Sequence, residues 1–272
     1  MKRPAWNPTR RNRNLGTANA GHGSENRMVI PTSWNDPRVY WEKLTNPVTV
    51  VTRGVTVLVE PCRPGFLHAV TVDDVAHVMG LLPPDDIARI KAVVLRVPTR
   101  KQHGLAGVWG RMAYFAQLGA VEGPVVMLEA NPAEYTFTKS SSLSPDEAEE
   151  VDRLRSDGHE VTSSRRGWRI RTTLDSVRRT QLFRTLPHEV GHHVQFDRAV
   201  RVGAGGDWEA ELRLRDLYFT KPRREKEDFA HRYAREFIER VSALGQVPFP
   251  RIVDEVRMRQ AGLEPAWFGL EN

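Results

Sequence analysis

The motif His-Glu-x-x-His at residues 188–192 constrains the fold of this chain more than any other feature of its sequence. In an α-helix the positions i and i+4 lie roughly 40° apart around the axis, so His188 and His192 project to the same side and can bind one metal ion. Glu189 stands beside them without being a ligand. The opposite face of the helix is apolar and carries Phe183, Leu186, Val190 and Val194. The pattern therefore predicts a helix that packs on a core and carries a metal site on its other face.

Pro187 stands directly before this motif. If the helix begins near Thr185, the proline lies in the first turn, where its missing N–H is tolerated. If the helix begins near Ser176, the proline bends it just ahead of the two histidines. We favour the longer, kinked helix because Phe183 and Leu186 continue the apolar stripe.

A third ligand must come from a more distant part of the chain. Arg198 occupies the place of the third histidine in the extended motif, and Asp197 points about 180° away from the two histidines. A second helix is expected over Arg224–Leu244, and Glu227 lies about 50° from the centre of its apolar face. A buried acid without a partner is costly, so Glu227 is the candidate third ligand. An acid at a helix N-terminus that is otherwise solvated remains the alternative interpretation.

Other polar residues of that second helix complete the candidate site or face away from it. His231 follows Glu227 by one turn, where it either supports the metal site or the reaction, or is an ordinary interior histidine. Glu225 and Asp228 point about 150° away from the apolar face, so they are expected to face solvent.

Residues 36–272 are predicted to form one α+β domain: a small mixed sheet with a helix on it, followed by a mostly helical half. The expected strands are 48–52, 55–59, 90–97, 109–116 and 125–129, and a basic hairpin is expected at 160–163 and 168–172. The expected helices are 72–82, 145–156, 176–198, 207–218, 224–244 and 251–261.

Charge is distributed unevenly along the sequence. Residues 1–35 contain few periodic apolar positions and are predicted to be a disordered tail, and residues 1–27 alone account for +5 of the net charge of +6. Residues 140–160 are acidic and residues 161–184 are rich in arginine. We favour an acidic helix beside a basic hairpin over a dedicated anion site, and nucleic-acid binding through the tail stays open.

Composition excludes several classes of protein. With 40% hydrophobic and 27% charged residues, the chain is not disordered throughout. No apolar stretch approaches the roughly 18 residues of a membrane span, and the basic N-terminus does not resemble a Sec signal, so a cytoplasmic protein is expected, with export by a specialised route left open. Cys62 is the single cysteine, which excludes an internal disulfide and a cysteine-based zinc cluster.

On these residues the chain resembles the zincin metallopeptidases, and within them the gluzincins, whose third ligand is a glutamate on a later helix. The stretch 227–233 is similar to the corresponding segment of anthrax lethal factor-type peptidases, and more loosely to that of short intracellular metallopeptidases that cleave phage repressors. The resemblance implies a zincin-like fold and one Zn²⁺ per chain, held by His188, His192 and Glu227.

The resemblance also implies roles for further residues. Glu189 would be the general base, and Tyr218 or His231 would stabilise the developing oxyanion. In zincins the strand before the metal helix is an edge strand that pairs with the substrate, so a peptide would dock on Val125, Val126, Met127, Leu128 and Glu129. Residues 131–175 would then be an insertion over the cleft, with a charged helix and the basic hairpin. The sequence departs from that pattern at three places. His231 stands where the pattern has a second glutamate, and Asp228 replaces an apolar residue. The spacing of Tyr218 does not match securely that of the family's tyrosine.

Two hypotheses of function follow from different classes of protein. The first is a zinc-dependent endopeptidase that acts on a protein or peptide, in which Glu189 deprotonates the attacking water. The second is a nucleic-acid- or protein-binding module with a structural or degenerate metal site. A peptidase needs Glu189, whereas a structural site keeps its ion without it.

Overall fold

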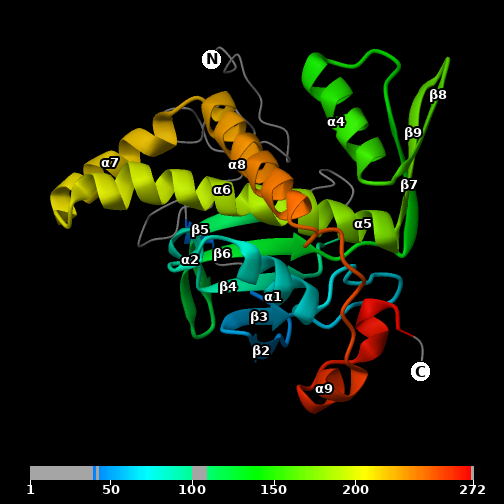
Figure 1. Ribbon diagram of the computed structural model, residues 1–272, viewed down its shortest axis with the longest axis horizontal. Coiled ribbons are helices and arrows are strands. Elements are labelled where there is room, and N and C mark those ends of the chain that lie inside the picture. Colours follow the sequence, from blue (N-terminus) through cyan, green and yellow to red (C-terminus); the bar gives the residue numbers. More distant parts are fainter. Residues whose placement is uncertain (1–38, 41–42, 100–108, 271–272) are drawn as a thin grey trace, which may run out of the picture.

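The protein has two β-sheets and a helical C-terminal half (Figure 1). The computed structural model describes residues 39–40, 43–99 and 109–270, so the predicted tail 1–35 lies outside the described residues. A mixed six-stranded sheet has the order β1-β5-β6-β4-β3-β2, and a three-stranded antiparallel sheet has the order β7-β9-β8. The predicted α+β architecture is therefore confirmed at this level.

The large sheet consists of β1 (Val39–Tyr40), β2 (Val48–Thr52), β3 (Val55–Val59), β4 (Ala92–Arg96), β5 (Gly110–Leu118) and β6 (Val121–Glu129). The hairpin β2–β3 turns at Arg53 and Gly54, both at positive φ. Strands β3, β4 and β6 run parallel, and β5 returns antiparallel to β6. The helix α1 (Val72–Leu81), capped by a Thr71–Asp74 capping box, packs on this sheet with the short helix α2 (Pro84–Ile87) after it.

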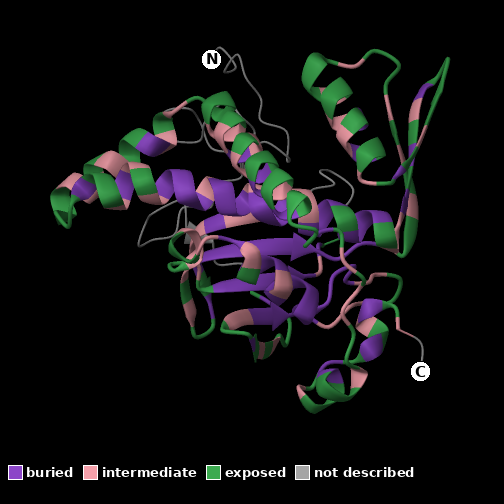
Figure 2. Cartoon of the chain, viewed as in Figure 1, coloured by how far each residue is buried: buried purple, intermediate pink, exposed green. Residues whose placement is uncertain are grey.

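The prediction that 125–129 is an edge strand is wrong. Strand β6 lies between β4 and β5 and is hydrogen-bonded to both. Its side chains alternate into two separate cores, Val126 and Leu128 on the helical face and Val125 and Met127 on the other. A strand that is buried on both faces belongs in the middle of a sheet, so its backbone is already paired and not free for a peptide. The buried centre of the sheet is visible in Figure 2.

The metal-motif helix is part of a long helical run, as the kinked interpretation predicted. It comprises α5 (Leu174–Thr180), a π-helical turn (Gln181–Thr185), α6 (Leu186–Phe196) and a second π-helical segment (Asp197–Val202). Pro187 has no N–H to donate to the carbonyl four residues earlier, and the turn just before it is wound with the N–H of Leu186 bonded to the carbonyl of Gln181.

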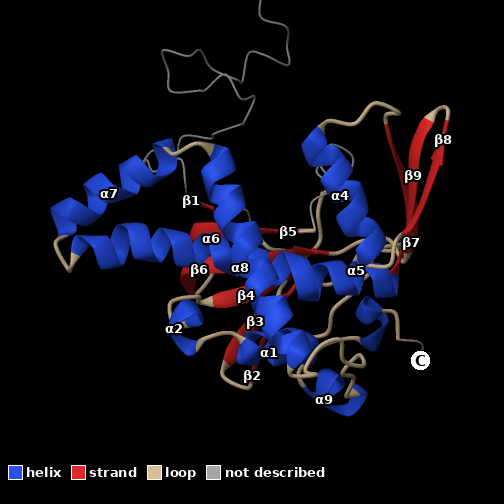
Figure 3. Cartoon of the chain, turned by 45° about the horizontal axis from the view of Figure 1, so that its top comes forward, coloured by secondary structure: helices blue, strands red, loops and turns tan. Residues whose placement is uncertain are grey.

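Two further helices follow, α7 (Trp208–Thr220) and α8 (Arg223–Ala243), which meet at a corner at Pro222. Helix α8 turns back across α6 (Figures 1 and 3). At the crossing, a Cβ added to Gly191 would lie 3.0 Å from the Cα of Ala230 and 3.1 Å from the Cβ of Tyr233. Only a residue without a side chain lets the two backbones come this close, so the crossing depends on Gly191.

A separate unit, which we call the 134–173 unit, stands beside this body. It consists of β7 (Glu134–Lys139), α4 (Pro145–Ser156), β8 (Glu160–Ser164) and β9 (Gly167–Thr173). Val151, Leu154 and Ile170 are buried within it. Strand β7 was not predicted, although Tyr135 and Phe137 are two residues apart, lie on the same face and stack on each other.

Ion pairs connect the acidic and the arginine-rich stretches of this region. Arg184 binds Glu150 at 2.9 Å and Asp157 at 2.8 Å, which ties the end of α4 to the π-helical turn. Arg171 pairs with Glu134 and Glu160 across the sheet. Much of the arginine-rich stretch is therefore neutralised by acids of the same chain.

The segment after α8 contacts the N-terminal end of α1, on the side of the molecule away from α7 (Figure 1). It contains α9 (Glu255–Gln260) and a 3-10 turn (Pro265–Phe268). The predicted helix 251–261 begins four residues late because Asp254 caps it and Ile252 is tied by its backbone to Thr71 and Asp74. Among the described residues, no helix combines the length and apolar character needed to cross a membrane.

Candidate metal centre

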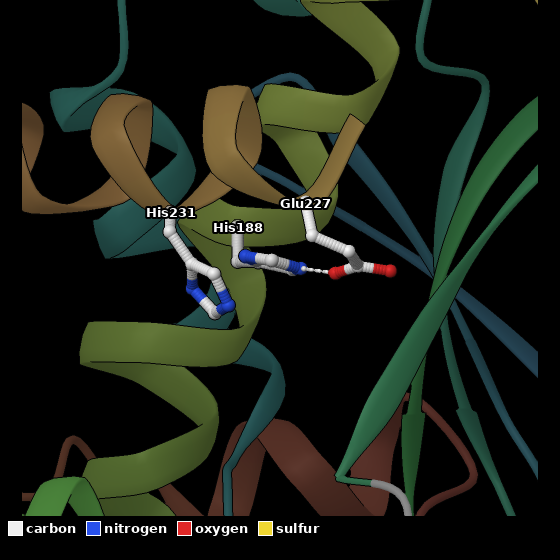
Figure 4. Close-up of side chains that lie close together, drawn as sticks. All are labelled: His188, Glu227 and His231. Carbon is white, nitrogen blue, oxygen red and sulfur yellow. Dashed lines mark ion pairs between the residues drawn. The ribbon is translucent and has the colours of Figure 1, made fainter. Parts of the chain in front are cut away.

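The crossing of α6 and α8 brings His188, His192 and Glu227 together. The Nε2 atoms of His188 and His192 lie 3.3 Å and 3.6 Å from the same Glu227 oxygen, Oε2. Glu227 stands on the first turns of α8 because Pro222 ends the preceding corner and directs that helix back over α6. Figure 4 shows the His188 ring edge directed at the Glu227 carboxylate.

His231 joins this group from the next turn of α8. Its ring centroid lies 4.4 Å from that of His188, and Figure 4 shows the two rings next to each other. His188, Glu227 and His231 offer ligand atoms that all lie within 4.8 Å of one another. This group could therefore hold a metal ion.

The charges of the site favour an ionised carboxylate among the imidazoles. Hydrogen bonds from His188 and His192 hold the pKa of Glu227 well below its usual range. Burial lowers the pKa of His231 to about 4, and the neighbouring His188 lowers it further. Deprotonated nitrogen and oxygen atoms are the forms that bind a metal ion.

The neighbouring acids of α8 lie outside the group. Glu225 pairs with Lys221 at 2.6 Å, and Asp228 pairs with Arg224 at 3.8 Å. Of the three acids, Glu227 is the one that lies near the two histidines, as its position on the helix predicted. Its role as a metal ligand stays a prediction. The side chains of His188, His192 and Glu227 are 12%, 13% and 33% exposed, so the group can be reached from the surface.

Glu189 is buried beside the histidines and is fixed by the sheet. Its carboxylate accepts a hydrogen bond from the backbone N–H of Met112 on β5. Burial raises the pKa of Glu189, and the nearby His188 and His192 oppose this shift. A carboxylate whose pKa is raised is a stronger base, and this one belongs to the residue between His188 and Val190 on the metal-motif helix.

Tyr218 is not open to the site. It is 1% exposed, and its hydroxyl donates to Gln195 Oε1 at 3.1 Å and lies 3.2 Å from the Tyr114 hydroxyl. The sequence analysis missed Tyr114 and Gln195. Gln195 follows His192 by three residues on the same helix, and Tyr114 follows Met112 by two residues on a strand. They are far apart in the sequence, so their link through Tyr218 can be seen only in the folded structure.

The 134–173 unit is close enough to act on this site electrostatically. The positive charges of Arg153, on α4, and of Arg184 both contribute to the lowered pKa of His231. These arginines show that charged groups lie near the site. They do not show a surface that closes over it, so the position of residues 131–175 over the cleft stays a prediction.

No family model, curated protein or solved structure matches this chain.

Proposed function

We propose that this chain is a zinc-dependent endopeptidase with a zincin-like active site, one Zn²⁺ per chain being held by His188, His192 and Glu227. The observation that carries the proposal is the convergence of both Nε2 atoms on one Glu227 oxygen, at 3.3 and 3.6 Å. Ligands about 2.0–2.2 Å from a tetrahedral zinc ion are themselves roughly 3.3–3.6 Å apart, so these separations suit that ion. The donor set of two imidazoles and a carboxylate is also one that catalytic zinc sites use.

Zinc bound there would supply a Lewis acid that lowers the pKa of water and polarises a carbonyl group. Glu189 would take the proton from the attacking water and deliver it to the leaving amine. The bond from the Met112 N–H would hold the Glu189 carboxylate in place against β5 beside the two histidines. This arrangement supports hydrolysis of an amide bond.

Strand β5, in place of β6, is the strand on which a substrate would dock. On one side it pairs with β6, and on the other the two-residue β1 pairs only with Phe115 and Ala116. In the part of the chain that the structure describes, the backbone of 110–114 therefore has no strand on its outer side, next to Glu189. An extended peptide added along that edge would bring a scissile bond to the two histidines.

The proposal is tested by metal analysis and by cleavage of a random peptide pool read by mass spectrometry. We expect one zinc per chain, retained in Glu189→Gln and lost in His192→Ala and Glu227→Gln. Glu189→Gln should lose cleavage by about 10²–10⁴-fold, the usual cost of removing a general base. Glu225→Gln, which changes an exposed acid of the same helix turn, is the matched control and should behave like the parent. A parent that binds no metal, or a Glu189→Gln variant that cleaves normally, would contradict the proposal.

A structural metal site is the second candidate, and His231 is the observation that favours it. If His188, Glu227 and His231 bind the ion together with His192, four protein ligands leave no position for water or substrate. In that case His231→Ala should release the metal, whereas in a peptidase it should retain it. The same variant therefore separates the two functions.

A further inference from the structure

Tyr114 lies on β5, close in sequence to Met112, whose backbone N–H binds the Glu189 carboxylate. It follows Met112 by two residues, and its ring packs against Phe196 of α6 and Phe219 of α7, with centroids 4.9 and 5.5 Å away. The ring is half-buried, and Tyr218 meets it edge to face. The Tyr114 side chain thus fills the space between its own strand β5, the metal-motif helix and α7.

The hydroxyl groups form a chain whose direction follows from counting protons. Tyr218 has one hydroxyl proton and donates it to Gln195 Oε1, which is an acceptor. The 3.2 Å contact between the two tyrosine oxygens must then use the proton of Tyr114. In the free protein Tyr114 therefore donates to Tyr218, which donates to Gln195 on α6.

The hydroxyl chain places Tyr114 beside the metal-motif helix, because it ends on Gln195, which follows His192 by three residues and lies on the same side of α6. Burial is the largest cause that raises the pKa of Tyr114, followed by Tyr218 and then by the charges of Glu189 and Glu227. Tyr114 is therefore a protonated donor at neutral pH. Tyr218, by contrast, is enclosed by Phe196, Phe219 and Tyr114 and is 1% exposed.

We propose that Tyr114 is the catalytic tyrosine of this site, which turns its O–H to the substrate carbonyl oxygen as negative charge develops there, and that Tyr218 and Gln195 are positioning residues that hold it. The inference rests on the proposed peptidase function and names a different residue from the one expected by resemblance. Only a hydrogen bond changes partner, because Tyr114 keeps its proton and gives up the bond to Tyr218.

This inference predicts an order among three conservative variants, each of which removes only a hydroxyl. The substrate is the peptide of the random pool that the parent cleaves fastest. Tyr114→Phe should lower kcat by about 10²-fold with little change in KM, in the range found when one oxyanion donor is removed. Tyr218→Phe should lower kcat by about 3–10-fold, since it frees Tyr114 without deleting it. Tyr135→Phe, in the small sheet, is the control and should match the parent.

A second measurement avoids turnover. Acetohydroxamate, a small metal-binding amide analogue, is titrated into the Co²⁺-loaded protein and followed by visible absorption. Tyr114→Phe should weaken its binding by about 5–10-fold through loss of one hydrogen bond, with metal content and thermal unfolding unchanged. Tyr135→Phe should bind it as the parent does.

Each outcome decides the inference. Equal kcat and equal acetohydroxamate affinity in Tyr114→Phe and the parent would overturn it, and a larger loss in Tyr218→Phe than in Tyr114→Phe would transfer the role to Tyr218. If Glu189→Gln is inactive while Tyr114→Phe is fully active, the peptidase stands and this inference fails alone. If the parent neither cleaves the pool nor changes its cobalt spectrum with acetohydroxamate, the proposed function fails and the inference fails with it.

Discussion

The crossing of α6 and α8 and the attachment of the 134–173 unit use different kinds of contact. At the crossing, Gly191 lies against the backbone of Ala230, and buried apolar residues such as Leu186 and Val190 anchor α6 to the sheet. At the attachment, Arg184 binds two acids and His159 contacts two hydroxyl groups. Apolar packing contains no group that titrates, whereas ion pairs are screened by salt and both ion pairs and histidine contacts respond to pH. The metal centre is thus built on a rigid base, and the unit beside it can be loosened separately.

The largest expected effect comes from damaging the apolar base. Leu186→Ala deletes a fully buried side chain of the core, so it should lower the free energy of unfolding by about 2–5 kcal/mol. Chemical denaturation of the metal-free protein measures it. Leu217→Ala, at a side chain 57% exposed on α7, is the control and should change stability little. Equal effects of the two changes would show that α6 is not anchored as described.

The attachment should weaken with acid. Burial lowers the pKa of His159 to about 4, from an ordinary value of 6.5, so the unfolded chain binds more protons between these pH values. Stability of the attachment is therefore present above about pH 6.5 and is lost as pH falls toward 4, by up to about 3 kcal/mol. Limited proteolysis of residues 134–173 as a function of pH should show this loss, and His159→Gln should remove the pH dependence. Cleavage that is independent of pH in the parent would show that His159 does not control the attachment.

The close approach at the crossing gives the next effect. Gly191→Ala places a methyl group 3.0–3.2 Å from atoms of Ala230 and Tyr233, so α8 must move and Glu227 with it. We expect a loss of about 1–3 kcal/mol in stability and a weaker affinity for zinc. In Gly80→Ala the new methyl group meets no atom within 4 Å, so stability should stay the same or rise slightly. Competition with a chelator measures the affinity, and unchanged zinc binding in Gly191→Ala would contradict the link between the crossing and the site.

The smallest effect belongs to the start of α4. Ser144 accepts a hydrogen bond from the backbone of Glu147, and the Glu147 side chain accepts one from the backbone of Ser144. Ser144→Ala should cost about 1 kcal/mol, confined to the 134–173 unit. Hydrogen exchange should be faster in α4 and unchanged in α6. Ser141→Ala is the control outside the helix, and a change spreading to α6 would mean that the two regions are coupled.

The local parts of this structure could be predicted from the sequence, and the long-range parts could not. Apolar spacing predicted α6 and α8, and the same spacing put Glu227 rather than Glu225 toward the histidines. The order of strands depends on pairings between distant segments, so the sequence pattern could not tell the central β6 from an edge strand. Tyr114 was missed for a related reason: the register of β5 shifts between Ala113 and Ala116, which breaks the simple alternation of faces.

The contacts between residues 252–257 and the start of α1 also have a consequence for folding during synthesis. Arg257 binds Asp73 at 2.6 Å and the Thr52 hydroxyl at 2.7 Å, and the Ile252 backbone binds Asp74. These partners leave the ribosome long before residues 252–257 are made. The start of α1 therefore gains these partners only after residues 252–257 have been made, and a nascent chain arrested before Ile252 should stay sensitive to protease around α1. The metal-motif helix is synthesised before that segment, so its synthesis precedes completion of the contacts on α1.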